Sequence, residues 1–175
     1  MTKDHLLGLY QTKRNHIQLT YASLILWSYP DTPHFFTELY AEMKEIPKPF
    51  PNLHVLLIDD AAMRIACQEL YESAYRSAIK ELFSLTKLYC HSTGQLQALK
   101  SQPWFQFWRI LRNCWSHDMV FSFNPAEKAV LPVTWSGTKI ELSMNGKHFT
   151  HGHCSFAKLY ELIETAQAYV KDELA

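Results

Sequence analysis

Residues Leu56 to Tyr89 have the sequence LLIDDAAMRIACQELYESAYRSAIKELFSLTKLY, which contains neither glycine nor proline. Its apolar residues recur at steps of three and four, the spacing of one face of an α-helix. They form two neighbouring rows: Met63, Cys67, Leu70 and Ala74, and then Tyr71, Tyr75, Ala78, Leu82, Leu85 and Tyr89. One helix, or two nearly continuous ones, fits this pattern. Because two rows bury a broad face, we expect the central helix of an antiparallel bundle.

Shorter helices are expected before this segment. Apolar spacing predicts a first helix over Arg14 to Tyr29, which stops before Pro30. A second is predicted over Asp31 to Ile46, with Pro33 just inside its first turn. Three prolines then predict a stiff connector: Pro47, Pro49 and Pro51.

Two more helices are predicted toward the C-terminus. After a loop from His91 to Ser101, Ser101 is expected to cap a helix that continues over Trp104 to Ser116. Ser155 is expected to cap the last helix, which runs to about Leu174. The buried row of that helix is predicted to contain Phe156, Leu159, Tyr160, Ile163, Ala166 and Tyr169 or Val170.

Between these two helices the apolar period changes to that of β-strands. Three short strands are predicted, over Val130 to Trp135, Lys139 to Ser143 and Lys147 to Thr150. Ser136-Gly137 and Asn145-Gly146 are the expected turns. The predicted fold is therefore mainly α, a single-domain antiparallel up-and-down helical bundle over residues 1–175, with a small β-meander at about 130–150 before the C-terminal helix.

Composition limits the kinds of function that the chain can have. Of its 175 residues 47% are apolar, and 17 basic residues balance 17 acidic ones, so a site for a polyanion must be local. The four cysteines include no Cys-x-x-Cys pair, which is typical of a reducing compartment. The first ten residues are too polar for a secretory signal, and no apolar run is long enough to span a membrane. We expect a soluble, cytoplasmic protein without a membrane partner.

The helix over Trp104 to Ser116 carries a polar stripe opposite its aromatic side. Gln106, Arg109, Asn113 and then Ser116 or His117 follow one another at helical steps, and Arg112 lies at the edge of the same face. Polar groups on such an aromatic helix are costly unless they meet solvent, a partner or a substrate. We therefore expect this stripe to be the working surface.

The stripe contains Arg112 and Asn113 followed by His117, and this order resembles the motif of the HEPN superfamily, in which Leu-Arg-Asn precedes a nearby histidine. Leu111 to His117 match the motif position by position. The likeness extends loosely to the predicted long helices before the motif, to Asp118 after it, and to the stretch Val133 to Gly137 before a terminal helix.

The resemblance implies a helical domain that in many members is a metal-independent endoribonuclease and works as a homodimer. RNA is then the expected substrate, without a cofactor or a metal, and an antitoxin or regulatory protein is a further possible partner. His117 would be the general acid or base and Arg112 would bind phosphate. Asn113 would orient the imidazole or bind phosphate. Arg109 and Ser116 are candidates for substrate binding.

Helix geometry leaves the function open between two classes. Arg112 and His117 are five residues apart, so on a straight helix their directions differ by roughly 140°. They converge only if the helix ends near His117, if Arg112 reaches far, or if a dimer forms. The alternative is a non-catalytic module of the same superfamily that binds a protein partner or a nucleotide.

Other chemistry-bearing residues have simpler interpretations. His148, His151, His153 and Cys154 lie close in sequence, but zinc ligands usually come from two separated pairs, so a polar turn is expected. Asp59 and Asp60 are expected to form the acidic first turn of a helix. Cys114 falls on the apolar side of its helix, which argues against a catalytic thiol.

Overall fold

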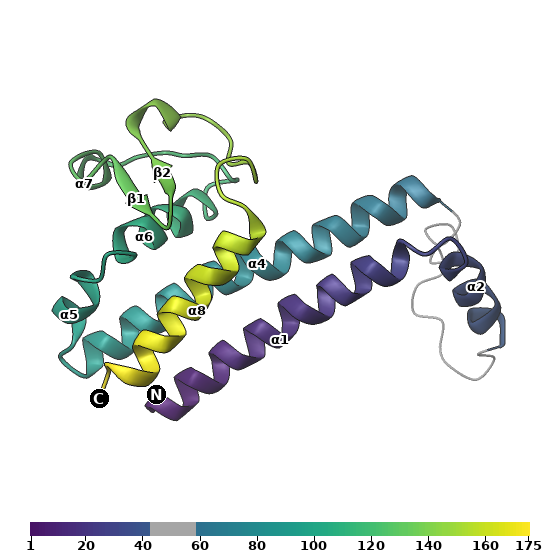
Figure 1. The fold of residues 1–175 in the computed structure, drawn as a ribbon, viewed down its shortest axis with the longest axis horizontal. Helices are drawn as coiled ribbons and strands as arrows, with labels where there is room; N and C mark the ends of the chain where they lie inside the picture. The colour runs from purple at the N-terminus through teal and green to yellow at the C-terminus, as the bar shows by residue number, and fades with distance from the viewer. Residues whose placement is uncertain (43–58) are drawn as a thin grey trace. The chain divides into compact units, whose positions relative to one another are not determined.

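The computed structural model describes residues 1–42 and 59–175, which fall into two compact units. One unit contains Met1–Arg14 and Tyr75–Ala175, and the other contains Asn15–Ala74. Helix α1 (Lys3–Trp27) and helix α4 (Asp60–Ser92) each contribute to both units (Figure 1). The architecture is mainly helical, with one two-stranded antiparallel hairpin before the C-terminal helix, which confirms the predicted class.

Helix α4 confirms the prediction of a long helix with a broad buried face. It is one continuous helix over Asp60–Ser92. Asp59 caps its start, because its Oδ1 accepts hydrogen bonds of 3.0 Å from the backbone N–H groups of Ala61 and Ala62. The predicted rows are buried at Met63, Cys67, Tyr71, Ala74, Tyr75, Ala78, Leu82 and Tyr89. The exceptions are Leu70, at 44% exposed, and Leu85, which is half-buried.

Helix α1 begins at Lys3, so the prediction of a start at Arg14 is wrong. Leu6 and Tyr10 add two buried positions to the row that Ile17 continues. Tyr10 also shares a buried hydrogen bond of 2.7 Å with Thr86 of α4. Burial against other elements, which local pattern cannot show, extends the helix past Gly8.

The second predicted helix is confirmed over the residues that the structure describes. Helix α2 spans Thr32–Glu42, with Pro33 in its first turn as expected. The remaining predicted positions to Ile46, the connector with Pro47, Pro49 and Pro51, and residues 56–58 of the predicted long helix lie outside the described residues.

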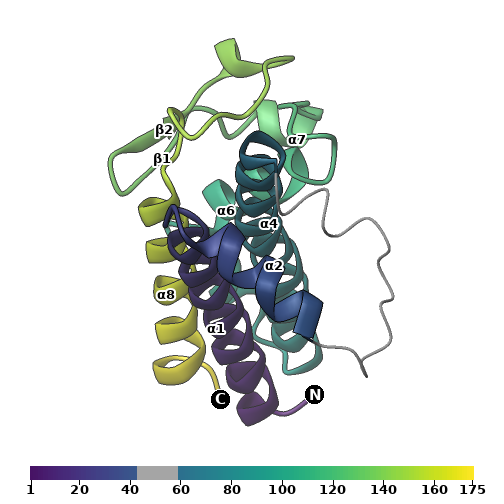
Figure 2. The ribbon, with the colours of Figure 1, turned by 90° about the vertical axis from the view of Figure 1, so that its right-hand side faces the viewer.

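In the unit that holds both chain ends, α8 (Phe156–Asp172) runs antiparallel to α1 (Figures 1 and 2). Arg14 of α1 donates to Tyr160, Gln167 and Glu164 of α8, while Lys3 donates to the carbonyl of Leu174. The predicted cap is confirmed, since Ser155 Oγ accepts from the N–H of Lys158. The buried row differs slightly from the prediction: Leu159, Leu162, Ile163, Ala166, Tyr169 and Val170 are buried, and Phe156 and Tyr160 are half-buried.

The predicted loop before the motif helix contains a short helix, α5 (Leu96–Lys100). Leu99 is buried, and Ser101 ends α5, with its hydroxyl donating to the carbonyl of Ala98. The prediction that Ser101 is the N-cap of the next helix is therefore wrong. Helix α6 spans Phe105–Cys114, and Trp104 is at its N-cap position without a side-chain cap bond.

The β-meander is reduced to a hairpin of β1 (Val133–Trp135) and β2 (Thr138–Ile140), after the four-residue helix α7 (Pro125–Lys128). The turn is at Ser136-Gly137, as predicted, with φ of 46° and 78°. The third predicted strand is wrong. Residues 146–149 instead exchange backbone hydrogen bonds with residues 119–121, the segment that follows α6. A long-range pairing thus takes the backbone groups that a third strand would have offered to β2.

Trp108 of α6 connects the motif helix to α4. It has no exposed surface, and its indole N–H donates to the carbonyl of Ile79 at 3.0 Å. The ring also packs edge-on against Phe83 of α4. This contact determines where the polar face of α6 lies.

The hydrogen bond of Trp108 can be measured with a matched pair of variants. Trp108→Phe and Trp104→Phe remove the same atoms from nearly equally buried sites, but in the described residues the indole nitrogen of Trp104 has no hydrogen-bond partner. In urea unfolding, we expect Trp108→Phe to lower the free energy of unfolding by about 1 kcal/mol more than Trp104→Phe. Equal losses would show that the bond to Ile79 contributes nothing net.

Candidate functional site

The polar face of α6 forms one wall of a groove whose other wall is the C-terminal half of α4. The groove has a volume of about 810 Å³. Its lining residues come from α4, α5 and α6: Phe83, Ser84, Lys87, Leu88, His91, Lys100, Phe105, Gln106, Arg109, Arg112 and Asn113. The structure therefore brings Arg109, Arg112 and Asn113 of the predicted stripe together on one surface.

Positive charge is concentrated in this groove. Lys87, Lys100, Arg109 and Arg112 line it, and among the described residues no aspartate or glutamate does. Within the described residues, none of the four cations has a carboxylate within ion-pair distance. The field of the four charges therefore adds up locally, although the whole chain has no net charge.

Arg112 is held in place through Asn113 by a buried carboxylate. Arg112 Nη1 donates to Asn113 Oδ1 at 3.0 Å, and Asn113 Nδ2 donates to Glu127 Oε1 at 2.6 Å. Glu127 is only 1% exposed, and its second oxygen accepts from the N–H of Asn124 at 3.0 Å. This chain of hydrogen bonds fixes the amide of Asn113, so that its oxygen faces the guanidinium.

Sequence reasoning missed Glu127, although a local signal was present. Asn124-Pro125-Ala126-Glu127 has the pattern of a capping box, with proline at the first helical position. The structure contains that box: Asn124 accepts from the N–H of Glu127, while Glu127 accepts from the N–H of Asn124. The pattern predicts a short helix here, but it gives no sign that the carboxylate also reaches Asn113 of α6.

Several polar atoms of the groove are buried without a hydrogen-bond partner among the described residues. They are Gln106 Oε1, Arg109 Nε and Arg112 Nε. Arg109 makes one long contact, from Nη2 to the carbonyl of Ala126 at 3.4 Å. A buried polar group without a partner costs about 1–3 kcal/mol, so structural stability alone does not explain why these side chains line the groove.

The remaining motif residues lie outside the lining of this groove. Ser116 donates from its hydroxyl to the carbonyl of Arg112 at 2.8 Å, and both it and His117 are exposed. His117 follows the end of α6 and begins a tight turn, in which its carbonyl accepts from the N–H of Val120. Asp118 and Met119 in this turn have φ of 53° and 61°. His117 thus lies after the end of α6 and is not among the residues that line the groove with Arg112.

In the histidine and cysteine cluster after the hairpin, the side chains stack on, bond to or are buried among neighbouring residues. The ring of His151 stacks on Phe156 at 3.8 Å, and His153 Nδ1 accepts from the N–H of Thr150 at 3.0 Å. Cys154 is buried, which raises the pKa of its thiol to about 11. Over residues 1–42 and 59–175, no three histidine, cysteine, aspartate or glutamate side chains are grouped as a metal site.

Cys114 lies beside the motif on the buried side of α6, as predicted. It is 2% exposed, and burial raises the pKa of its thiol to about 12. At neutral pH the group is therefore a thiol and not a nucleophilic thiolate.

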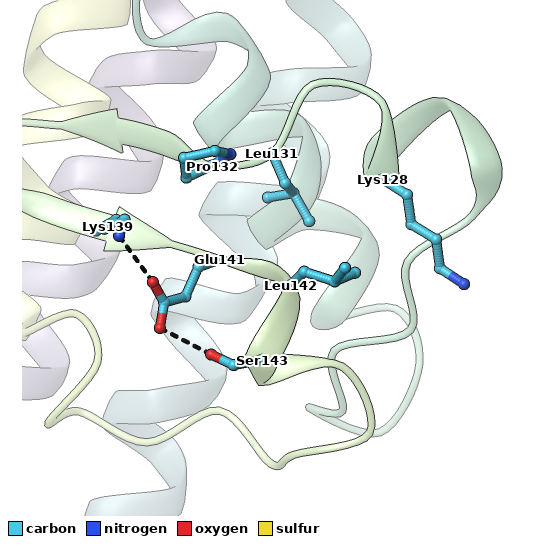
Figure 3. A pocket seen from close by; sticks show the side chains of 7 residues that line it. All are labelled: Lys128, Leu131, Pro132, Lys139, Glu141, Leu142 and Ser143. Atoms are coloured by element: carbon cyan, nitrogen blue, oxygen red, sulfur yellow. Dashed lines mark hydrogen bonds and ion pairs between the residues drawn. The ribbon is translucent and has the colours of Figure 1, made fainter.

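A second hollow, of about 340 Å³, lies between α7 and the hairpin (Figure 3). Figure 3 shows Glu141 bonded to Lys139 and to Ser143, each at 2.8 Å. Because its carboxylate already binds a neighbouring cation and hydroxyl, this hollow offers less unpaired charge than the groove.

Comparisons of the chain with family models, with curated proteins and with solved structures found no match. In the part of the chain that the structure describes, no helix combines the length and apolar character needed to cross a membrane.

Glu127→Gln tests the hydrogen-bond chain from α7 to Arg112. The new amide directs an N–H₂ group toward either Asn113 Nδ2 or the N–H of Asn124, both of which are donors. We expect the free energy of unfolding to fall by about 1–3 kcal/mol. Glu164→Gln, at a partly exposed ion pair with Arg14, is the control and should change it by less than about 1 kcal/mol. Equal effects of the two variants in urea unfolding would argue against this role.

Proposed function

We propose that this chain is a cytoplasmic, metal-independent endoribonuclease of HEPN type. One observation carries the proposal: Arg112 and Asn113 of the motif are held on a groove that four cations line, with no carboxylate in its lining over residues 1–42 and 59–175. Such a surface suits the phosphodiester backbone of RNA, and guanidinium groups bind phosphate oxygens in pairs.

The proposed reaction needs only side chains of this kind. The ribose 2′-oxygen attacks the adjacent phosphorus and the 5′-oxygen leaves, giving a 2′,3′-cyclic phosphate and a 5′-hydroxyl end. His117 takes the proton of the 2′-hydroxyl or delivers one to the leaving oxygen. Arg112 stabilises the charge that develops on the phosphate oxygens. Asn113 positions Arg112 through its amide oxygen, since its N–H₂ group is bonded to Glu127.

The two flanking candidates have different surroundings. Arg109 lines the same groove as Arg112 and would contact a neighbouring phosphate. Ser116 bonds to the carbonyl of Arg112 and is exposed, so its hydroxyl could meet substrate only near the end of α6.

A homodimer would complete the site. His117 does not line the groove that contains Arg112, so we propose that a second copy of the chain supplies the imidazole. The described residues of the unit 15–74 expose apolar side chains that a partner could cover: Leu19, Tyr21, Ile25, Leu26, Tyr29, Phe35, Leu39, Ile65 and Leu70. An antitoxin or regulatory protein is a further proposed partner.

A non-catalytic binding module is the second candidate. It is favoured by the hydrogen bonds that Arg112 and Asn113 make within the chain, which form without substrate, and by the position of His117 outside the groove. In this case the groove binds a ligand or partner without cleaving it.

Cleavage assays distinguish the two candidates. With a pool of random-sequence single-stranded RNA and EDTA present, we expect wild-type protein to cleave, and 2′-O-methylated RNA to resist. Arg112→Ala and His117→Ala should each lower the rate by at least about 100-fold, because each removes transition-state stabilisation or proton transfer. His5→Ala, at an exposed histidine of α1, is the control and should cleave like wild type. Intact RNA with folded wild-type protein would favour the binding module.

Mixing two inactive variants tests the shared site. If Arg112 of one copy works with His117 of another, a heterodimer of Arg112→Ala and His117→Ala chains contains one intact centre. Random exchange then restores about a quarter of the wild-type rate, since half the dimers are mixed and each has one working site of two. No recovery, despite subunit exchange shown by mass spectrometry of labelled chains, would place both residues of a centre in one chain.

A further inference from the structure

The end of the groove away from the motif has a charge pattern that the proposed chemistry does not use. Lys87 lies on the C-terminal half of α4 and Lys100 is the last residue of α5, and both side chains line the groove. Both residues are exposed. Neither has an ion-pair or hydrogen-bond partner among the residues that the structure describes.

Elsewhere in the same unit, several cations have acidic partners. Lys13 pairs with Glu81, Arg14 with Glu164, and Lys158 with Glu161, at N–O distances of 2.7 to 2.9 Å. In the groove, by contrast, none of the four lining cations has an acidic partner among the described residues. Four cations without counter-ions repel one another, and a bound polyanion would relieve that repulsion.

The shape of the groove favours an extended ligand over a single small anion. On α6 the lining residues run from Phe105 to Asn113, and on α4 from Phe83 to His91. Eight residue steps of an α-helix rise about 12 Å, so each wall is long enough to contact more than one phosphate. Phe83 of α4 and Phe105 of α6 both line the groove and pack against each other, so the lining includes an aromatic contact as well as the cations.

We propose that this groove binds the phosphodiester backbone of a single-stranded nucleic acid, with Lys87 and Lys100 as the contacts farthest from the motif. Recognition is through phosphate, so the sugar of the strand matters little to binding. The inference rests on the proposed function only in taking the bound strand to be the one that is cleaved. A concave, cation-lined groove suits one flexible strand, whose backbone can follow both walls.

Single-stranded DNA separates binding from cleavage, because it has no 2′-hydroxyl to attack. Fluorescence anisotropy with a labelled 12-nucleotide single strand measures the affinity of wild-type protein and of Lys87→Ala/Lys100→Ala. We expect the double variant to bind about tenfold more weakly. The slope of log affinity against log salt should become shallower by about 1.4, at about 0.7 for each lost phosphate contact on a single strand.

The control variant is Lys147→Ala/Lys171→Ala, which removes two exposed lysines of the same unit that do not line the groove. It should keep the affinity and salt slope of wild type. Loss of binding equal to that of the groove variant would overturn the proposal, because it would show that total charge matters and the groove does not. Inorganic triphosphate that competes as strongly as the 12-nucleotide strand would overturn it as well, in favour of a small polyphosphate site.

The two proposals fail in different ways. If the groove binds as expected but wild-type protein cleaves no RNA, the endoribonuclease proposal fails and the binding site stands. If RNA is cleaved while the groove variant binds DNA and cleaves RNA like wild type, the binding proposal fails alone. A circular dichroism spectrum and an unfolding curve for each variant confirm that it is folded.

Discussion

Packing of Trp108 against α4 is the contact on which the candidate site depends. A ten-residue helix such as α6 is not stable alone, so its position is set by what its aromatic side contacts. Burial of Trp108 and its bond to the carbonyl of Ile79 fix the position of α6 along α4 and its rotation about its own axis. With that side fixed, Arg109 and Arg112 can only emerge along the edge where α6 meets α4, and this edge is the groove.

Glu127 adds a second constraint on the same helix. A carboxylate that is 1% exposed would be costly without partners, and here neutral donors from α6 and from the backbone of Asn124 satisfy both oxygens. The carboxylate therefore couples the capping box of α7 to Asn113, and through it to Arg112. One residue thus serves a local helix start and a long-range contact, which explains why a four-residue helix has a buried glutamate.

The parts of the fold that were predictable from sequence are those that depend on local pattern. Apolar spacing predicted α4, and the hydroxyl of Ser155 and the Ser136-Gly137 turn act within three residues of their own position. Most of the errors involve partners distant in sequence; the misplaced cap is local, because the Ser101 hydroxyl bonds back to Ala98 at the end of α5. Tyr10, in the part of α1 that the prediction left out, bonds to Thr86, 76 residues away, and the carbonyl of Lys147 accepts from the N–H of Phe121 in place of a bond to β2. Glu127 was missed for the same reason, since its partner Asn113 is 14 residues away.

The motif itself shows the same division between local and distant contacts. Helical spacing places Arg109, Arg112 and Asn113 on one face, and the structure gathers them in the groove. His117 is different, because α6 ends at Cys114 and the chain then turns through two residues with positive φ. Aspartate tolerates this conformation, but methionine at 119 is strained by roughly 1–2 kcal/mol. Phe149 donates its N–H to the carbonyl of Met119 in this turn, and Phe121 after the turn donates to the carbonyl of Lys147, so the segment at 147–149 holds the turn in place. His117 thus lies in the turn after α6 and not among the residues that line the groove with Arg112, which is why the proposed chemistry takes one of the two groups from another chain.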